Sequence, residues 1–67
     1  MKIILNNSTE NLTVESCTVD ELLKIKNFTF KMLIIKINGR LVRKEEFPTA
    51  MVRDGDVVIV HHLISGG

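Results

Sequence analysis

The sequence predicts an α+β domain in which a mixed sheet of four to five strands packs on one helix. Three observations lead to this prediction. Short apolar segments with two-residue periodicity are separated by turn signals, a single segment has the apolar spacing of a helix, and 67 residues suffice for one small domain. We therefore expect a single domain over residues 1–67, with a flexible C-terminal tail at about residues 63–67.

The N-terminal part of the chain predicts a hairpin. Residues 2–5 alternate as a strand that turns Lys2 and Ile4 away from the core. Residues 6–9 have the Asn, Ser and Thr composition of a turn, and residues 11–15 alternate as a second strand.

A helix should follow this hairpin. Thr18 and Glu21 have the spacing of a capping box, in which each side chain accepts a hydrogen bond from the backbone N–H of the other residue. Asn27 is a suitable residue to end the helix after about two to three turns. The apolar stripe that faces the sheet consists of Val19, Leu22 and Leu23.

The second half of the chain predicts further strands. Leu33–Ile37 reads as a strand, and the Asn38-Gly39 pair predicts a tight hairpin into Leu41-Val42, because both turn residues tolerate a positive φ. The remaining elements are a short helical turn at residues 45–48, a sharp turn at residues 54–56 and a final strand at residues 57–62. Besides the helix stripe, the predicted core contains Ile3, Leu5, Leu12, Val14, Leu33, Ile35, Ile37, Val58 and Val60.

Composition argues against several kinds of partner. Nine basic residues against eight acidic ones give a net charge of +1, which does not favour binding to nucleic acid or to a membrane surface. The longest apolar run has four residues, whereas a membrane-spanning helix needs about 20. A single cysteine cannot form an internal disulfide, so we expect a reduced, cytoplasmic protein.

Residues able to carry catalysis or to bind a metal are few. Cys17 lies just before the helix cap, at the position where a small buried side chain packs against Leu22. His61 and His62 are adjacent on a predicted strand, so they point to opposite faces and cannot share a metal ion without distortion. We expect no catalytic residue, no metal and no bound cofactor, and we predict that the chain is not an enzyme.

The C-terminal end has a different character. The chain closes on Gly66-Gly67, directly after Leu63, Ile64 and Ser65. Glycines have no Cβ, so this end can pass through a narrow channel in another protein and leave the terminal carboxylate unhindered. Such an end suits a carboxylate that is itself the reacting group, because adenylation by ATP supplies the leaving group that it lacks.

Five motifs follow one another along nearly the whole chain. They are residues 1–6, TVDELL at residues 18–23, INGRLVR at residues 37–43, VRDGDVVI at residues 52–59, and Gly66-Gly67. In their order and spacing they resemble the ThiS-type sulfur carrier proteins, the small ubiquitin-like components of thiamine biosynthesis. The resemblance implies a ubiquitin-like β-grasp fold.

The resemblance also implies a carrier function. An E1-like adenylyltransferase (ThiF type) would use ATP to activate the carboxylate of Gly67, and sulfur from a persulfide donor would then replace the AMP. A thiazole synthase (ThiG type) would take the sulfur from the resulting thiocarboxylate. Gly66 and Gly67 would thus form the covalent sulfur-carrying C-terminus, with ATP bound by the partner only. We expect a monomer when the carrier is free.

A contact surface is predicted independently of the resemblance. If the strands turn their core residues toward the helix, then Ile4, Ile34, Val57 and Ile59 lie on the opposite face of the sheet. Several exposed apolar side chains on one face mark a protein–protein contact. The residues predicted to bind partners are therefore Ile4, Ile34, Val57 and Ile59, together with Leu63, Ile64 and Ser65.

Four alternatives remain open from the sequence. A MoaD-type sulfur carrier for molybdopterin synthesis has the same fold and terminal glycines, although those proteins tend to be longer. A carrier could also serve cysteine synthesis or another sulfur pathway. A ubiquitin-like modifier would instead form an isopeptide bond through Gly67, and a noncovalent interaction module would not need the two terminal glycines.

Overall fold

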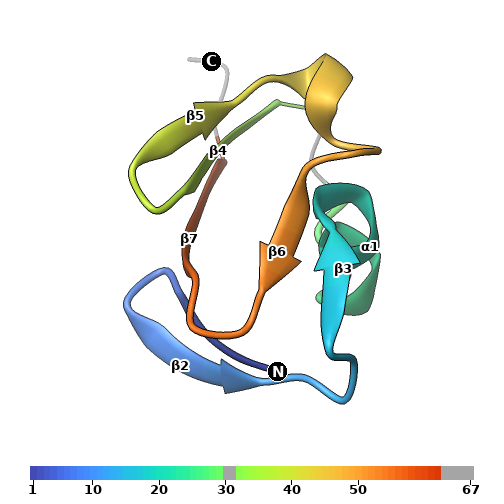
Figure 1. Cartoon of the computed structure of the whole chain (residues 1–67). Coiled ribbons are helices and arrows are strands. Elements are labelled where there is room, and N and C mark those ends of the chain that lie inside the picture. The colour runs from blue at the N-terminus through green and yellow to red at the C-terminus, as the bar shows by residue number, and fades with distance from the viewer. Residues whose placement is uncertain (30–31, 63–67) are drawn as a thin grey trace.

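The computed structural model describes residues 1–29 and 32–62 (Figure 1). Within this part of the chain there are seven strands, one α-helix and one 3₁₀ turn. In chain order they are β1 (Lys2–Leu5), β2 (Ser8–Asn11), β3 (Ser16–Thr18), α1 (Val19–Ile25), β4 (Leu33–Ile37), β5 (Arg40–Val42), η1 (Lys44–Glu46), β6 (Met51–Arg53) and β7 (Val57–His62).

Five of the strands form a mixed sheet in the order β2-β1-β7-β4-β5. β1 and β7 run parallel, whereas β1–β2, β4–β7 and β4–β5 are antiparallel pairs. β3 and β6 form a separate antiparallel pair beside α1 (Figure 1). One helix with a mixed five-stranded sheet confirms the predicted α+β class and the β-grasp arrangement that the resemblance implies.

The parallel pair of β1 and β7 is extended by one asparagine side chain. In the strands, Ile4 lies opposite Val57. Beyond the end of β1, the Asn6 N–H donates to Val58 O at 3.0 Å. Asn6 Oδ1 then accepts from Val60 N–H at 2.9 Å, and Asn6 Nδ2 donates to Val60 O at 3.1 Å. The Asn6 carboxamide therefore takes the place of a further strand residue.

The sharp turn before β7 holds the other end of this pair. Gly55, at φ +88°, allows the chain to reverse. The Lys2 N–H donates to Asp54 Oδ1 at 2.7 Å, and the Gly55 N–H donates to Lys2 O at 2.8 Å. Asp56 Oδ1 accepts from Asn38 Nδ2 at 3.0 Å. The predicted turn is thus confirmed, and it joins β1 to the turn between β4 and β5.

The helix begins and ends where the sequence predicts. Thr18 Oγ1 accepts from Glu21 N–H at 3.2 Å, and Glu21 Oε1 accepts from Thr18 N–H at 2.8 Å. The hydrogen bond from the Thr18 backbone above all, and then the Thr18 side chain, lower the pKa of the Glu21 carboxyl. The N–H groups of the first two helical residues donate to Ala50 O at 2.9 Å and to Phe47 O at 3.1 Å. Asn27, at φ +58°, follows the last turn.

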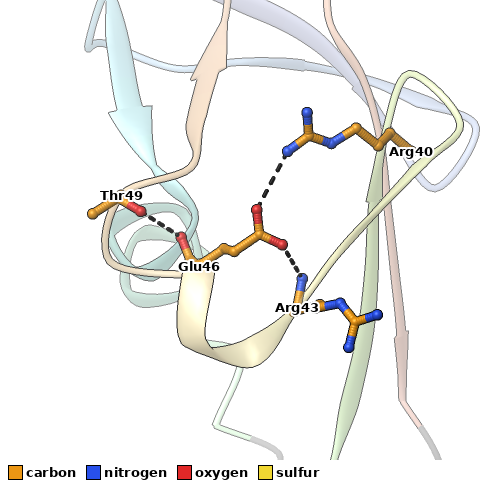
Figure 2. A network of polar contacts seen from close by, with 4 residues as sticks. All are labelled: Arg40, Arg43, Glu46 and Thr49. Carbon is orange, nitrogen blue, oxygen red and sulfur yellow. Dashed lines mark hydrogen bonds and ion pairs between the residues drawn. The ribbon is translucent and has the colours of Figure 1, made fainter.

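Figure 2 shows how the segment after β5 is held. Glu46 Oε1 accepts from Arg43 N–H at 3.1 Å, and Glu46 Oε2 lies 3.3 Å from Arg40 Nη2. Thr49 Oγ1 donates to Glu46 O at 3.3 Å. Glu46 therefore links β5 to the chain that leads into β6. The predicted helical turn is present here, at residues 44–46 rather than 45–48.

The core lies between the sheet, α1 and the β3–β6 pair. Its buried apolar residues are Ile3, Leu5, Cys17, Val19, Leu22, Ile35, Val42, Phe47, Val52, Val58 and Val60. Leu12, Val14, Leu23, Leu33 and Ile37, also predicted for the core, are partly buried and pack against it. The sequence prediction missed Val42, Phe47 and Val52.

The predicted position of the second strand is wrong. The structure places it at Ser8–Asn11 and not at residues 11–15. Asn6 and Asn7 alone make the turn, with φ of +50° and +68°, because asparagine tolerates this left-handed region. The alternation at residues 11–15 reflects side chains that pack against the core from an irregular segment.

The sequence does not predict β3 or β6. Each has three residues, which is too short for a periodic pattern to stand out. Cys17 and Val52 lie opposite each other in the pair, and both are buried. Long-range packing rather than local sequence therefore creates these two strands.

We expect Asn6→Ala to lower the free energy of unfolding by about 2–3 kcal/mol, because Val60 loses both partners and alanine strains at a positive φ. Asn7→Gly is the matched control, since Asn7 occupies the same turn at φ +68° and glycine fits that backbone. Urea unfolding should place the control within about 0.5 kcal/mol of the parent. Equal losses for both variants would show that the Asn6 carboxamide contributes nothing beyond the turn.

Candidate functional site

The four strand residues predicted to bind partners lie on one face of the five-stranded sheet. Ile4 is opposite Val57 across β1 and β7, and Ile59 follows Val57 two residues along the same strand. Ile34 is opposite His61 across β4 and β7. Residues opposite each other share a face, so these side chains lie together on the side away from the core. We call this side the outer face; its strand residues on β1, β4, β5 and β7 are Lys2, Ile4, Ile34, Lys36, Leu41, Val57, Ile59 and His61.

Much of the outer face is apolar and open to solvent. Ile4, Val57 and Ile59 are 42%, 41% and 42% exposed, and Ile34 is half-buried. Leu41, which is 51% exposed, joins them from β5. The sequence prediction missed Leu41, although the alternation that follows the Asn38-Gly39 turn points to it. An apolar face of this kind favours contact with another protein.

The tail predicted to complete the site follows β7, the central strand of this sheet. β7 ends at His62, which lies opposite Leu33 at the start of β4. The predicted site residues Leu63, Ile64, Ser65, Gly66 and Gly67 lie outside the described residues. Their roles stay predictions.

Cys17 is packed into the core. Cys17 is 3% exposed. Leu22, against which the sequence predicts that it packs, is fully buried. Burial raises the pKa of the Cys17 thiol, and the nearby Glu21 carboxylate adds to this effect. The structural role predicted for Cys17 is therefore confirmed, and its thiol stays protonated near neutral pH.

The two histidines point to opposite sides of β7. His61 is opposite Ile34, and His62 is opposite Leu33. Among residues 1–29 and 32–62, no group of three or more His, Cys, Asp or Glu side chains is placed to hold a metal ion. Over the same residues, no helix has the length and the apolar character needed to cross a membrane.

A hollow of about 570 Å³ opens on the other side of the sheet, between the β4–β5 hairpin and β6. Its lining residues are Ile37, Asn38, Arg40, Val42, Thr49, Ala50, Met51, Arg53 and Asp56. The Asp56 carboxylate already accepts from Asn38 Nδ2 and from Arg53 N–H, and the Thr49 hydroxyl donates to Glu46 O. The described lining therefore offers no nucleophile with a free base beside it, and the outer face remains the better candidate site.

The arrangement of strands and helix defines the chain as a ubiquitin-like β-grasp protein with an apolar outer face. The ThiS family model matches residues 3–67, and the chain belongs to the ThiS family. The resemblance predicted from the sequence motifs is therefore confirmed. Among curated proteins, no sequence matches the chain significantly.

Two solved structures are similar over the whole chain. One is the crystal structure of the thiamine biosynthesis protein (ThiS) from Geobacter metallireducens, with a TM-score of 0.89, 28% identity and coverage of 100% of both chains. The other is the solution NMR structure of a thiamine biosynthesis protein from Geobacter metallireducens, with a TM-score of 0.82 and 28% identity. That match covers 100% of this chain and 88% of the other.

We expect the Cys17 thiol of the folded protein to resist a disulfide reagent at pH 8, because burial limits both access and ionisation. Addition of urea should make the same thiol react at once. In the control variant Ser16→Cys, which adds a thiol at an exposed position of the same strand, one of two thiols should react in the folded state. Rapid, complete labelling of the folded parent would contradict the buried, protonated state.

Proposed function

We propose that this chain is a sulfur carrier of thiamine biosynthesis, which holds sulfur as a thiocarboxylate at Gly67. The observation that carries the proposal is the match to the ThiS family model over residues 3–67, because the matched region includes both terminal glycines. The two similar structures, both of thiamine biosynthesis proteins, support the choice of pathway.

The chemistry begins with a carboxylate, which nucleophiles do not attack until it is activated. On an E1-like adenylyltransferase (ThiF type), a carboxylate oxygen of Gly67 attacks the α-phosphorus of ATP and releases pyrophosphate. The terminal sulfur of a persulfide donor then attacks the acyl carbon, and AMP leaves. A thiol of the donor system cleaves the S–S bond, which yields the thiocarboxylate on Gly67 and a disulfide on the donor.

In this scheme the carrier is a cosubstrate and its partners are the catalysts. The ATP is bound by the adenylyltransferase, and a thiazole synthase (ThiG type) receives the sulfur. The described residues are consistent with this division of roles, because Cys17 is buried as a protonated thiol and the hollow near β6 offers no activated nucleophile.

The outer face has the second role in the proposal, which is to dock the carrier on each partner. Ile4, Val57 and Ile59 expose apolar surface that a partner would bury, and each Å² so buried contributes about 25 cal/mol. Docking would bring residues 63–67, with Leu63, Ile64 and Ser65 as further contacts, toward the partner's active site. A carrier that is held by its sheet can present Gly67 to different enzymes in turn.

The proposal is tested by intact-protein mass spectrometry of the chain after incubation with the adenylyltransferase of its own genome, ATP, a persulfide donor and a thiol. We expect a mass gain equal to the exchange of one oxygen atom for one sulfur atom. Addition of thiazole synthase and its other substrates should return the mass to its starting value. This second step separates a thiamine carrier from a carrier that serves another sulfur pathway.

Deletion of Gly67 provides the control, because the chain loses the reacting carboxylate in its proper position but keeps residues 1–66. The deleted chain should show no mass gain while its urea midpoint stays unchanged. A parent chain that is not modified by a demonstrably active adenylyltransferase would contradict the proposal. A covalent adduct with a lysine of another protein would favour a modifier instead.

We expect Ile59→Glu to weaken binding to the adenylyltransferase at least tenfold, because a carboxylate would enter the apolar contact. The matched control is Ile25→Glu, since Ile25 is 47% exposed on α1 whereas Ile59 is 42% exposed on the outer face. Titration calorimetry should find the control within about threefold of the parent, and urea unfolding should show both variants folded. Equal affinity of the two variants would exclude the outer face as the docking surface.

A further inference from the structure

Lys36 places a positive charge among the apolar residues of the outer face. On β4 it lies opposite Ile59 of β7 on one side and opposite Leu41 of β5 on the other. Ile34 is its neighbour along β4 on the same face. The Lys36 side chain therefore rises from a position with apolar neighbours on three sides.

The described strands supply no negative charge to this face. Glu10 is the one acidic residue within the seven described strands, and it lies opposite Ile3 on the core side of the sheet. There the Lys26 Nζ lies 2.5 Å from Glu10 Oε1. The Lys36 ammonium has no hydrogen-bond or ion-pair partner among residues 1–29 and 32–62. Lys36 is exposed, so no described residue takes the place of water around its ammonium.

A partner that covers the outer face removes that water. An ammonium group in an apolar contact is costly unless an acceptor, best a carboxylate, replaces the lost hydration. The apolar neighbours Ile34, Leu41 and Ile59 cannot provide one. The acceptor must therefore come from the partner, and a partner without it binds less well.

We infer that Lys36 selects the docking partner, and that the surface of the adenylyltransferase that covers the outer face carries a carboxylate placed to pair with the Lys36 ammonium. This inference rests on the proposed function, because it assumes that the outer face docks on that enzyme. It adds the chemistry of the partner surface, which is an apolar patch with at least one Asp or Glu side chain inside it.

The same charges disfavour a second copy of this chain as the occupant. Two outer faces in contact would bring Lys36 and Lys2 of one copy toward those of the other, with no carboxylate from the described strands between them. An anionic lipid surface would also attract these lysines, and it is distinguished from a protein partner by the experiment below.

The test compares the affinities of the full chain and its variants for the adenylyltransferase by titration calorimetry at low and high salt. Lys36→Met keeps the aliphatic stem but removes the charge, and we expect at least about 30-fold weaker binding, because the partner's carboxylate is left buried and unpaired. Lys36→Arg should bind within a few fold of the parent. Lys24→Glu, on the exposed side of α1, is the control for net charge and should change affinity less than threefold.

Lys36→Glu should bind more weakly than Lys36→Met, and replacement of one Asp or Glu of the enzyme by Lys should restore its binding. If Lys36→Met binds as tightly as the parent while Ile59→Glu does not, the outer face still docks and the inference about Lys36 is wrong. If the parent binds the adenylyltransferase but gains no sulfur, the proposed function is contradicted, while the inference about Lys36 stands. Absence of binding even by the parent, or parent binding to phosphatidylserine vesicles that Lys36→Met abolishes, would overturn the inference.

Discussion

The parallel pairing of β1 with β7 is the interaction on which the rest of the structure depends. It joins strands whose paired residues are more than 50 positions apart, and Asn6 fastens it with hydrogen bonds to Val60 over a separation of 54 residues. β2 can then add to the free edge of β1, and β4 to the free edge of β7. Both surfaces of the sheet follow from this pairing, because it brings Ile4 beside Val57 on the outer face and Leu5 beside Val58 in the core.

The local sequence correctly predicts the helix start and the turns, because residues within a few positions of each other determine their geometry. The capping box of Thr18, the Asn38-Gly39 turn and the turn at Gly55 are all found where their residue types indicate. Prediction fails where a distant partner decides the outcome. The β3–β6 pair exists because Cys17 and Val52 meet in the core, and the strand after Asn7 starts early because two asparagines suffice for the turn.

The same distinction between local and long-range information applies to the residues of the candidate site. Alternation within single strands correctly places Ile4, Val57 and Ile59 on the face away from the core. That Lys36 lies between Leu41 and Ile59 depends on the register of three strands, which no single segment encodes. The role proposed for Gly66 and Gly67 rests on their chemistry and on the family match, since they lie outside the described residues.

The burial of Cys17 has a consequence for the fidelity of sulfur transfer. A protein that meets persulfides and disulfides at each cycle risks capturing sulfane sulfur on any thiolate it exposes. This chain has one cysteine, and the fold keeps it under the first turn of α1 as a protonated thiol. Under the proposed function, the buried thiol therefore competes poorly with the carboxyl end for the sulfur of a persulfide donor.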